Sequence, residues 1–192
     1  MSTTQPIKNP KQLATFKSYY LQERPNPRNH MLIIIGLNSA LRISDILGLT
    51  YGDLYHFQHR TWKSHIVLRE QKTGKTNRIY INREIREILK LYVNIEEKTP
   101  ASWLFVSQIQ KTKPLSRFQA YRIVKEAAAF AGMDANISCH SLRKTFGYHA
   151  WKQGTPPALL MSIYNHSAYG ITKRYLGIDQ DDKDEVFAKI KL

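Results

Sequence analysis

Residues 138–143 read Ser-Cys-His-Ser-Leu-Arg, which places a histidine and an arginine three positions apart. If this stretch is helical, His140 and Arg143 lie on the same face of the helix. The guanidinium of an arginine can donate two parallel hydrogen bonds to a phosphate, which the ammonium of a lysine cannot do. The same spacing is frequent in surface helices, so it indicates a phosphate site only together with other residues.

Two further candidates follow downstream. His166 comes 23 positions after Arg143, and Tyr175 comes nine positions after His166. Read alone, His166 could equally cap a helix or lie in the core, and a tyrosine in a chain with 11 of them usually serves packing. A phenol becomes a nucleophile only where a base and nearby cations stabilise the phenolate. Tyr175 is therefore a candidate nucleophile only if the fold brings such groups to it.

Upstream, residues 40–45 read Ala-Leu-Arg-Ile-Ser-Asp. Arg42 has apolar neighbours, and burying a guanidinium without a partner is costly. Asp45, three positions later, is the expected supporting residue for Arg42. The pattern is compatible with a simple buried ion pair and with an arginine that binds substrate.

The residues between these motifs predict a small sheet within a mainly helical chain. Residues 61–68 and 78–81 are rich in strand-forming residues and flank a turn that contains Lys72, Gly74 and Lys75, which predicts an antiparallel hairpin. A lysine at such a tip is normally just solvated.

Helical periodicity and capping residues predict helices elsewhere. Asn9 and Pro10 mark the first start, and Ser44 and Ser141 are expected caps further on. The expected ranges are 10–24, 28–40, 45–47, 85–92, 115–131, 141–154, a shorter helix from 156, and a last one within 179–192. Residues 1–9 are expected to form a loose arm. The predicted fold class is α+β, mainly α-helical, with a small antiparallel β-sheet in one domain over residues 1–192.

The composition favours a partner that is a polyanion. The formal net charge is +14 and the pI about 9.9, which suits DNA, RNA or an anionic membrane surface. No apolar run approaches the roughly 20 residues that span a bilayer, and the N-terminal residues lack the features of a signal peptide, so we expect a cytoplasmic protein. The single cysteine, Cys139, is expected to be a buried structural residue, and no histidine, cysteine or aspartate cluster has metal-ligand spacing.

Taken together, these residues resemble the active site of the tyrosine recombinases, the phage integrase family. Residues 40–45 match the pattern around the first arginine of that family, and the order arginine, lysine, His-x-x-Arg, histidine, tyrosine is the same. The family places a lysine in the hairpin, where Gln71 to Gly74 matches through Lys72 better than through Lys75. The resemblance covers about residues 28–178. Because only about 40 residues precede Arg42, the chain is similar to the short fimbrial-invertase-like recombinases, or is a fragment without an N-terminal DNA-binding domain.

The resemblance implies a site-specific DNA recombinase that cleaves and rejoins strands through a 3′-phosphotyrosyl intermediate on Tyr175. It implies that Arg42 and Arg143 hold the phosphate and that Lys72 protonates the leaving 5′-oxygen. His140 would accept the tyrosyl proton or orient the phosphate, and His166 would add a hydrogen bond. No metal or cofactor is implied.

The implied partners are double-stranded DNA and further copies of the chain, which would form a tetramer on DNA. The helix within 179–192 is expected to pack on its own domain or in trans on a neighbouring subunit, and accessory DNA-bending proteins are compatible with this activity. Three alternatives are a type IB topoisomerase-like enzyme, a family member that binds DNA without catalysis, and a basic RNA-binding or membrane-surface protein. The target sequence and the choice between integration, excision, inversion and resolution are not encoded in any pattern.

Overall fold

The computed structural model describes residues 4–133, 136–178 and 180–190. Helices dominate, and the strands form small antiparallel sheets, so the predicted fold class is confirmed. The elements in chain order are α1 (Pro10–Gln22), α2 (Pro27–Asn38), α3 (Ile43–Leu47), α4 (Tyr51–Leu54), β1 (Tyr55–His56), β2 (Thr61–Trp62), β3 (His65–Arg69), β4 (Thr76–Tyr80), α5 (Arg83–Tyr92), α6 (Arg117–Phe130), α7 (Cys139–Lys152), α8 (Pro157–Ile163), α9 (Tyr169–Leu176) and α10 (Gln180–Lys189).

Side-chain caps fix where several helices begin. The side chain of Asn9 accepts hydrogen bonds from the backbone N–H groups of Lys11 and Gln12, and Pro10 opens α1 as expected. Ser116 and Gln119 form a reciprocal capping box at the start of α6. The capping side chains accept hydrogen bonds from backbone N–H groups in the first turns of α1 and α6. The starts of these two helices therefore follow from the local sequence.

Two expected caps are wrong. α3 begins two residues earlier than predicted, with Arg42 and not Ser44 at the N-cap position. α7 begins at Cys139, because Ser138 caps it and Ser141 takes the third position of a capping box. This shift places both His140 and Arg143 inside the first turns of α7.

The predicted sheet is two separate two-stranded sheets. β3 and β4 pair antiparallel with Ile66 opposite Ile79, which confirms the hairpin. Residues 61–62, expected to extend this hairpin, instead pair with residues 55–56. The chain leaves the strand conformation between Trp62 and His65, where the backbone N–H of Lys63 donates to the carbonyl of Leu54. The β3–β4 hairpin is therefore short, and its tip lies close to α3.

α2 forms the centre of the main core and packs against α1, α5 and α7. Ile33 and Ile35 on α2 are fully buried, with 0% exposure. The contact with α7 requires Gly36, because a Cβ atom there would lie 2.6 Å from Cδ1 of Leu142. α2 and α7 thus approach closely, and α7 carries His140 and Arg143 at the edge of the core.

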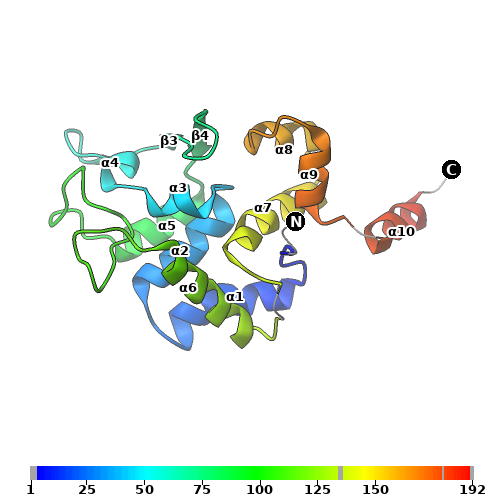
Figure 1. The fold of residues 1–192 in the computed structure, drawn as a ribbon, viewed down its shortest axis with the longest axis horizontal. Helices are drawn as coiled ribbons and strands as arrows, with labels where there is room; N and C mark the ends of the chain where they lie inside the picture. Colours follow the sequence, from blue (N-terminus) through cyan, green and yellow to red (C-terminus); the bar gives the residue numbers. More distant parts are fainter. Residues whose placement is uncertain (1–3, 134–135, 179, 191–192) are drawn as a thin grey trace.

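A second, smaller core lies between α7, α8 and α9. It is built around Ala40, Leu160, Tyr164 and Leu176. Figure 1 shows α8 and α9 together at one end of α7, away from α5. No helix is predicted over Tyr175, and α9 packs this residue against the second core.

The expectation of a loose N-terminal arm is wrong for residues 4–9. Ile7 is 1% exposed, its N–H donates to the Thr145 hydroxyl oxygen at 2.9 Å, and its carbonyl lies 2.9 Å from the His149 Nε2. A buried apolar side chain with both backbone groups paired is firmly held. Residues 1–3 lie outside the described residues.

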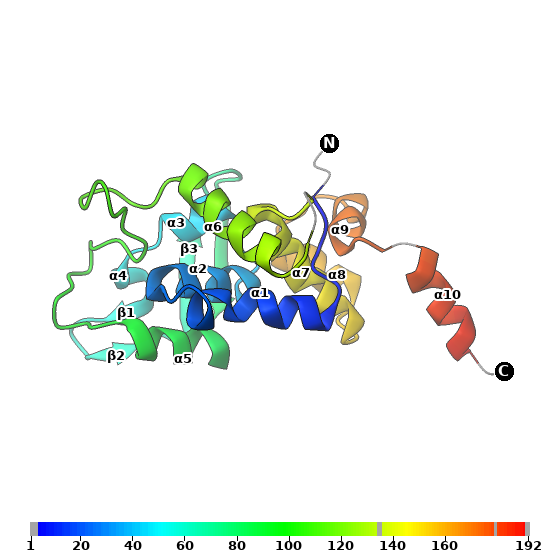
Figure 2. The ribbon, with the colours of Figure 1, turned by 90° about the horizontal axis from the view of Figure 1, so that it is seen from below.

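α10 stands apart from the rest of the chain in both views (Figures 1 and 2). Its Phe187 is 77% exposed, and Ile190, just beyond it, is 55% exposed. These two apolar side chains are therefore not buried against the rest of the described chain.

Candidate active site

Tyr175 lies between the two predicted histidines. Its ring centroid is 4.9 Å from that of His140 and 4.6 Å from that of His166, both in edge-to-face arrangements. The guanidinium carbon of Arg143 is 5.9 Å from the centre of the same ring. The fold therefore brings a phenol, two imidazoles and a guanidinium, from α7, α9 and the α8–α9 loop, into one half-buried cluster.

Both imidazoles are held in the neutral form. Burial lowers the pKa of His140 to about 4, helped by the positive charges of Lys144, Arg143, Arg42 and Lys72. Burial also lowers the pKa of His166 to about 4, helped by Arg143 and Arg42. The Nδ1 of His166 lies 2.9 Å from the Thr172 hydroxyl oxygen, which orients its ring. At neutral pH each imidazole has a nitrogen lone pair with which it can accept a proton or a hydrogen bond.

Arg143 is the largest fully buried side chain, with 1% exposure. Its Nη1 donates to the carbonyl of Ala40, and its Nη2 donates to the carbonyl of Tyr164 at 2.9 Å. Ala40 has φ +56° and Asn165 has φ +53°, so both carbonyls belong to turns with a left-handed residue. Arg143 therefore ties together the turns that precede Arg42 and His166.

This guanidinium has unused donors. A guanidinium carries more N–H groups than two carbonyls can take, and the Nε of Arg143 is buried with no hydrogen-bond partner. Burial and the nearby Arg42 lower the pKa of Arg143. The side chain is therefore rigidly placed and still able to donate to an anion at the cluster.

Arg42 pairs with Glu70 and not with Asp45. Its Nη1 donates to Oε2 of Glu70 at 2.5 Å, and the side chains are 15% and 0% exposed. Asp45 instead accepts a hydrogen bond from the backbone N–H of Gln71 at 3.0 Å, so the expected direct support of Arg42 by Asp45 is wrong. The hairpin explains this difference. It brings Glu70 to Arg42, while the carboxylate of Asp45 binds the backbone of Gln71.

Glu70 is the residue that sequence reasoning missed. It is 1% exposed and accepts hydrogen bonds from Thr73 at 2.7 Å, Asn77 at 3.1 Å and Asn165 at 3.2 Å besides Arg42. Burial alone would raise the pKa of its carboxyl, but the hydrogen bonds from Thr73, Arg42 and Asn77 and the charge of Arg42 together lower it to about 2. The ionised carboxylate therefore joins Arg42, the hairpin and the turn before His166.

Tyr164 was also missed. Its side chain is 0% exposed, its ring stacks on that of His166 at 5.1 Å, and its hydroxyl donates to the carbonyl of Arg143 at 2.8 Å. Gly147 makes room for it, because a Cβ atom there would lie 2.2 Å from the Tyr164 hydroxyl oxygen. The sequence around Tyr164 does not predict this packing, because it depends on Gly147, 17 positions upstream in the chain.

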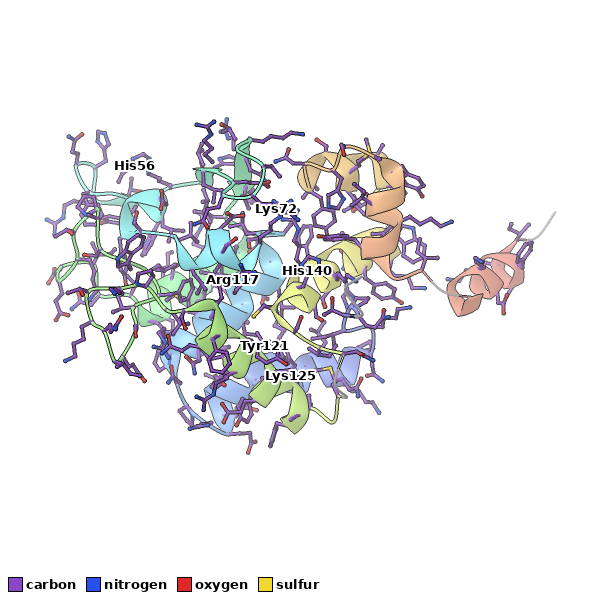
Figure 3. All side chains as sticks on the ribbon, in the orientation of Figure 1. His56, Lys72, Arg117, Tyr121, Lys125 and His140 are labelled. Atoms are coloured by element: carbon purple, nitrogen blue, oxygen red, sulfur yellow. The ribbon has the colours of Figure 1, made fainter. Side chains whose placement is uncertain are left out.

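Lys72 is exposed at the hairpin tip, and Figure 3 shows it on the same side of the molecule as His140. Its charge is among those that lower the pKa of His140. No hydrogen bond fixes the Lys72 side chain among the described residues. The charge of Lys72 thus acts on the cluster from the exposed hairpin tip.

Cys139 does not join the cluster as a nucleophile. Burial raises the pKa of its thiol to about 11, so the thiolate is scarce at neutral pH. Within residues 4–133, 136–178 and 180–190 no group of three or more histidine, cysteine or acidic side chains is placed to hold a metal ion. None of the helices described there has the length and apolar character needed to cross a membrane.

The fold is that of tyrosine recombinase catalytic domains. It superimposes with a TM-score of 0.75 on the crystal structure of the XerH site-specific recombinase in its post-cleavage complex with a palindromic difH substrate. The two share 20% identity, and the match covers 98% of this chain and 54% of that chain. The likeness establishes the fold of this chain.

The chain belongs to the phage integrase family, whose model matches residues 9–181. It is 41% identical over 181 residues to the protein named probable integrase/recombinase YoeC of Bacillus subtilis, covering 94% of this chain and 93% of YoeC. It is 29% identical over 156 residues to the type 1 fimbriae regulatory protein FimE of Escherichia coli K12, covering 77% of this chain and 73% of FimE. The family predicted from the motifs is confirmed.

Proposed function

We propose that this protein is a site-specific DNA recombinase that cleaves and rejoins DNA through a covalent bond between Tyr175 and a 3′-phosphate. The observation that carries the proposal is the position of the Tyr175 ring, between two neutral imidazoles and beside the buried guanidinium of Arg143. Family membership and the DNA substrate held by the related XerH recombinase support it.

The proposed chemistry needs only side chains of this chain. The hydroxyl oxygen of Tyr175 attacks the phosphorus, and its proton passes to His140. Arg42 and Arg143 donate hydrogen bonds to the non-bridging oxygens and oppose the charge that builds up in the transition state. Lys72 gives a proton to the departing 5′-oxygen, so that a hydroxyl and not an alkoxide leaves. His166 adds a hydrogen bond to the phosphate, and attack by a partner strand's 5′-hydroxyl reverses every step.

The role of Lys72 can be separated from that of its neighbour at the tip. Lys72→Ala should slow cleavage of ordinary DNA by about 10²- to 10⁴-fold, the range typical of a lost general acid. A substrate with sulfur at the 5′-bridging position should restore most of the rate, because a thiolate leaves without protonation. Single-turnover cleavage on both substrates measures this, with Lys75→Ala as the matched control. Rescue of Lys75→Ala instead would assign the proton to the other lysine.

A basic stripe on α6 supports DNA as the substrate. Arg117, Tyr121 and Lys125 are four positions apart and lie along one face of the helix, on the side of the molecule that carries Lys72 and His140 (Figure 3). Arg117 is exposed, and Tyr121 is 43% exposed. A helix with arginine and lysine on its outer face can contact phosphates and base edges in a major groove.

Binding to DNA should weaken steeply with salt, because each neutralised phosphate releases condensed counterions. We expect a slope of log affinity against log salt of roughly −4 to −8, and Arg117→Ala should make it shallower by about one. Arg83→Ala is the control, because Arg83 is exposed on α5, which lies on the opposite side from α6 in Figure 2. If the DNA affinity of the wild-type chain did not change with salt concentration, DNA would not be its main partner.

α10 supports assembly of several copies on DNA. It leaves Phe187 and Ile190 exposed, and four of the five residues 181–185 are acidic in a chain of net charge +14. An acidic helix with exposed apolar side chains is a poor ligand for DNA and suits a groove on a second, basic copy of the chain. The proposed assembly is a tetramer on DNA in which α10 couples neighbouring subunits.

Deleting residues 180–192 should leave binding of one DNA site within about twofold and reduce joining of two sites by about tenfold or more. Native gels and light scattering with one-site and two-site DNA measure the two steps. Phe187→Ser in the full chain is the milder variant and should show the same separation. Equal two-site assembly by the truncated and full chains would contradict the coupling role.

The topoisomerase-like alternative shares this chemistry and predicts relaxation of supercoiled DNA without exchange of partners. A plasmid with two sites distinguishes the outcomes, because recombination changes the connection of the DNA and relaxation does not. A cytoplasmic location and the contribution of accessory bending proteins stay predictions.

A further inference from the structure

Lys144 is a buried lysine that the proposed reaction does not use. It lies one residue after Arg143 on α7 and is 8% exposed, which is rare for lysine. Its Nζ donates to the carbonyl of Thr4 at 2.5 Å. Burying an ammonium is costly, and burial lowers the pKa of Lys144. A charged side chain buried next to the cluster therefore points to a role there.

The Lys144 ammonium lies beside the nucleophile. Its Nζ is 5.9 Å from the centre of the Tyr175 ring. His140 and Lys144 are four positions apart, so they occupy one face of α7 and both face Tyr175. Lys144 is also the first of the neighbouring charges that lower the pKa of His140. The cation therefore acts on both members of the proposed nucleophile–base pair.

The N-terminal segment holds this arrangement from two sides. Thr4 accepts from Lys144, and Ile7 is bound to Thr145 and His149 on α7. Pro6 packs against Gly177, two residues after Tyr175, so closely that a Cβ atom on Gly177 would lie 2.9 Å from the proline ring. Residues 4–7, which we call the N-terminal strap, thus bridge the helix of Lys144 and the end of the helix of Tyr175.

A cavity of about 1100 Å³ lies between the strap, α7 and α9, and Lys144, His140 and Tyr175 are among its lining residues. The groups that face Tyr175 are His140, Arg143 and Lys144 from α7, and Tyr164 and His166 from the end of α8 and the loop after it. The ammonium of Lys144 and the guanidinium of Arg143 are the cations of this set, and each lies 5.9 Å from the centre of the Tyr175 ring. The proposed reaction assigns Arg143 to the phosphate. Lys144 is therefore placed to stabilise negative charge that develops on the phenol oxygen.

We infer that Lys144 is a positioning residue for the nucleophile, and that the N-terminal strap holds its ammonium against Tyr175 through the Thr4 carbonyl. The inference rests on the proposed function of Tyr175. The strap is part of the active-site scaffold, and Lys144 acts on the attacking side of the phosphate, opposite to the leaving-group role of Lys72.

The test is single-turnover formation of the covalent adduct on nicked DNA that traps the cleaved state. Lys144→Met should slow adduct formation by at least about tenfold, with DNA affinity and melting temperature near wild type. Lys144→Arg, which keeps a cation, should recover most of the rate. Lys152→Met, an exposed position on the same helix, is the matched control and should behave as wild type.

A second comparison separates the attacking side from the leaving side. The 5′-bridging sulfur substrate should rescue Lys72→Ala but leave Lys144→Met slow, because sulfur removes only the need to protonate the leaving group. Deleting residues 2–5 takes away the Thr4 carbonyl and keeps Pro6 and Ile7. The deletion should slow adduct formation by the wild-type chain. It should have little further effect on Lys144→Met, since both changes remove the same hydrogen bond between Lys144 and Thr4.

The outcomes are distinct. Rescue of Lys144→Met by sulfur, equal loss in Lys144→Met and Lys144→Arg, or a wild-type rate in Lys144→Met would each overturn the inference. Full additivity of the deletion and Lys144→Met would overturn the part played by the strap. Failure of the wild-type chain to form any adduct would instead refute the proposed function itself.

Discussion

Replacing Tyr175 with phenylalanine should eliminate the covalent protein–DNA adduct, with a loss of about 10⁴-fold or more in its rate of formation. The phenyl ring keeps the edge-to-face contacts with His140 and His166, but the attacking oxygen is gone. DNA affinity should stay within about twofold, because the charges that bind phosphates are unchanged. Denaturing gels of labelled, nicked DNA measure the adduct, and filter binding measures the affinity.

Tyr169→Phe is the matched control for this change. Tyr169 opens the same helix, is 50% exposed, and has no ring contact with the histidines among the described residues. It should form adduct at the wild-type rate. A persistent adduct in Tyr175→Phe would identify another nucleophile and remove the basis of the proposed mechanism.

The second large effect is expected at Glu70. Glu70→Ala leaves the partly buried Arg42 without its partner, and breaking such a pair costs about 3–5 kcal/mol. The change also removes the acceptor that holds Thr73, Asn77 and Asn165. We expect a lower free energy of unfolding in chemical denaturation together with a loss of cleavage well beyond that of binding.

Glu70→Gln separates stability from chemistry, because the amide keeps the shape and can still accept hydrogen bonds. It should be more stable than Glu70→Ala yet remain defective in cleavage, since Arg42 loses its counter-charge. Glu87→Ala provides the control, because its ion pair with Arg83 is exposed at the surface. A Glu70→Ala protein as stable and active as the Glu87→Ala protein would contradict the central position of Glu70.

The motifs predicted which residues gather, because their order is tied to a known family and their chemistry is coherent. The resemblance to the family singled out His140, Arg143, His166 and Tyr175, and the fold places them together. The helix start at Pro10 was predicted, since the side chain of Asn9 caps it over two or three residues. The second helix begins at Pro27, one residue before the expected start, and Asn26 caps it. Such local signals need no tertiary context.

What could not be predicted depends on contacts far apart in the chain. Glu70 meets Arg42 across 28 positions and Asn165 across 95, so the nearby Asp45 was the only visible partner. The left-handed conformations of Ala40 and Asn165 are unusual for residues other than glycine and are supported by neighbouring structure. The guanidinium of Arg143 donates to the carbonyls of Ala40 and Tyr164 in these turns. No sequence pattern predicts this structural role.

Mapping the covalent bond tests the central claim most directly. The wild-type chain is reacted, in the presence of EDTA, with nicked DNA that traps the cleaved strand; protease and nuclease digestion and mass spectrometry then locate the nucleotide on the peptide. The account predicts a 3′-phosphate joined to the hydroxyl oxygen of Tyr175, formed at the same rate without metal. A nucleotide on another residue, or a link through a 5′-phosphate, would contradict it.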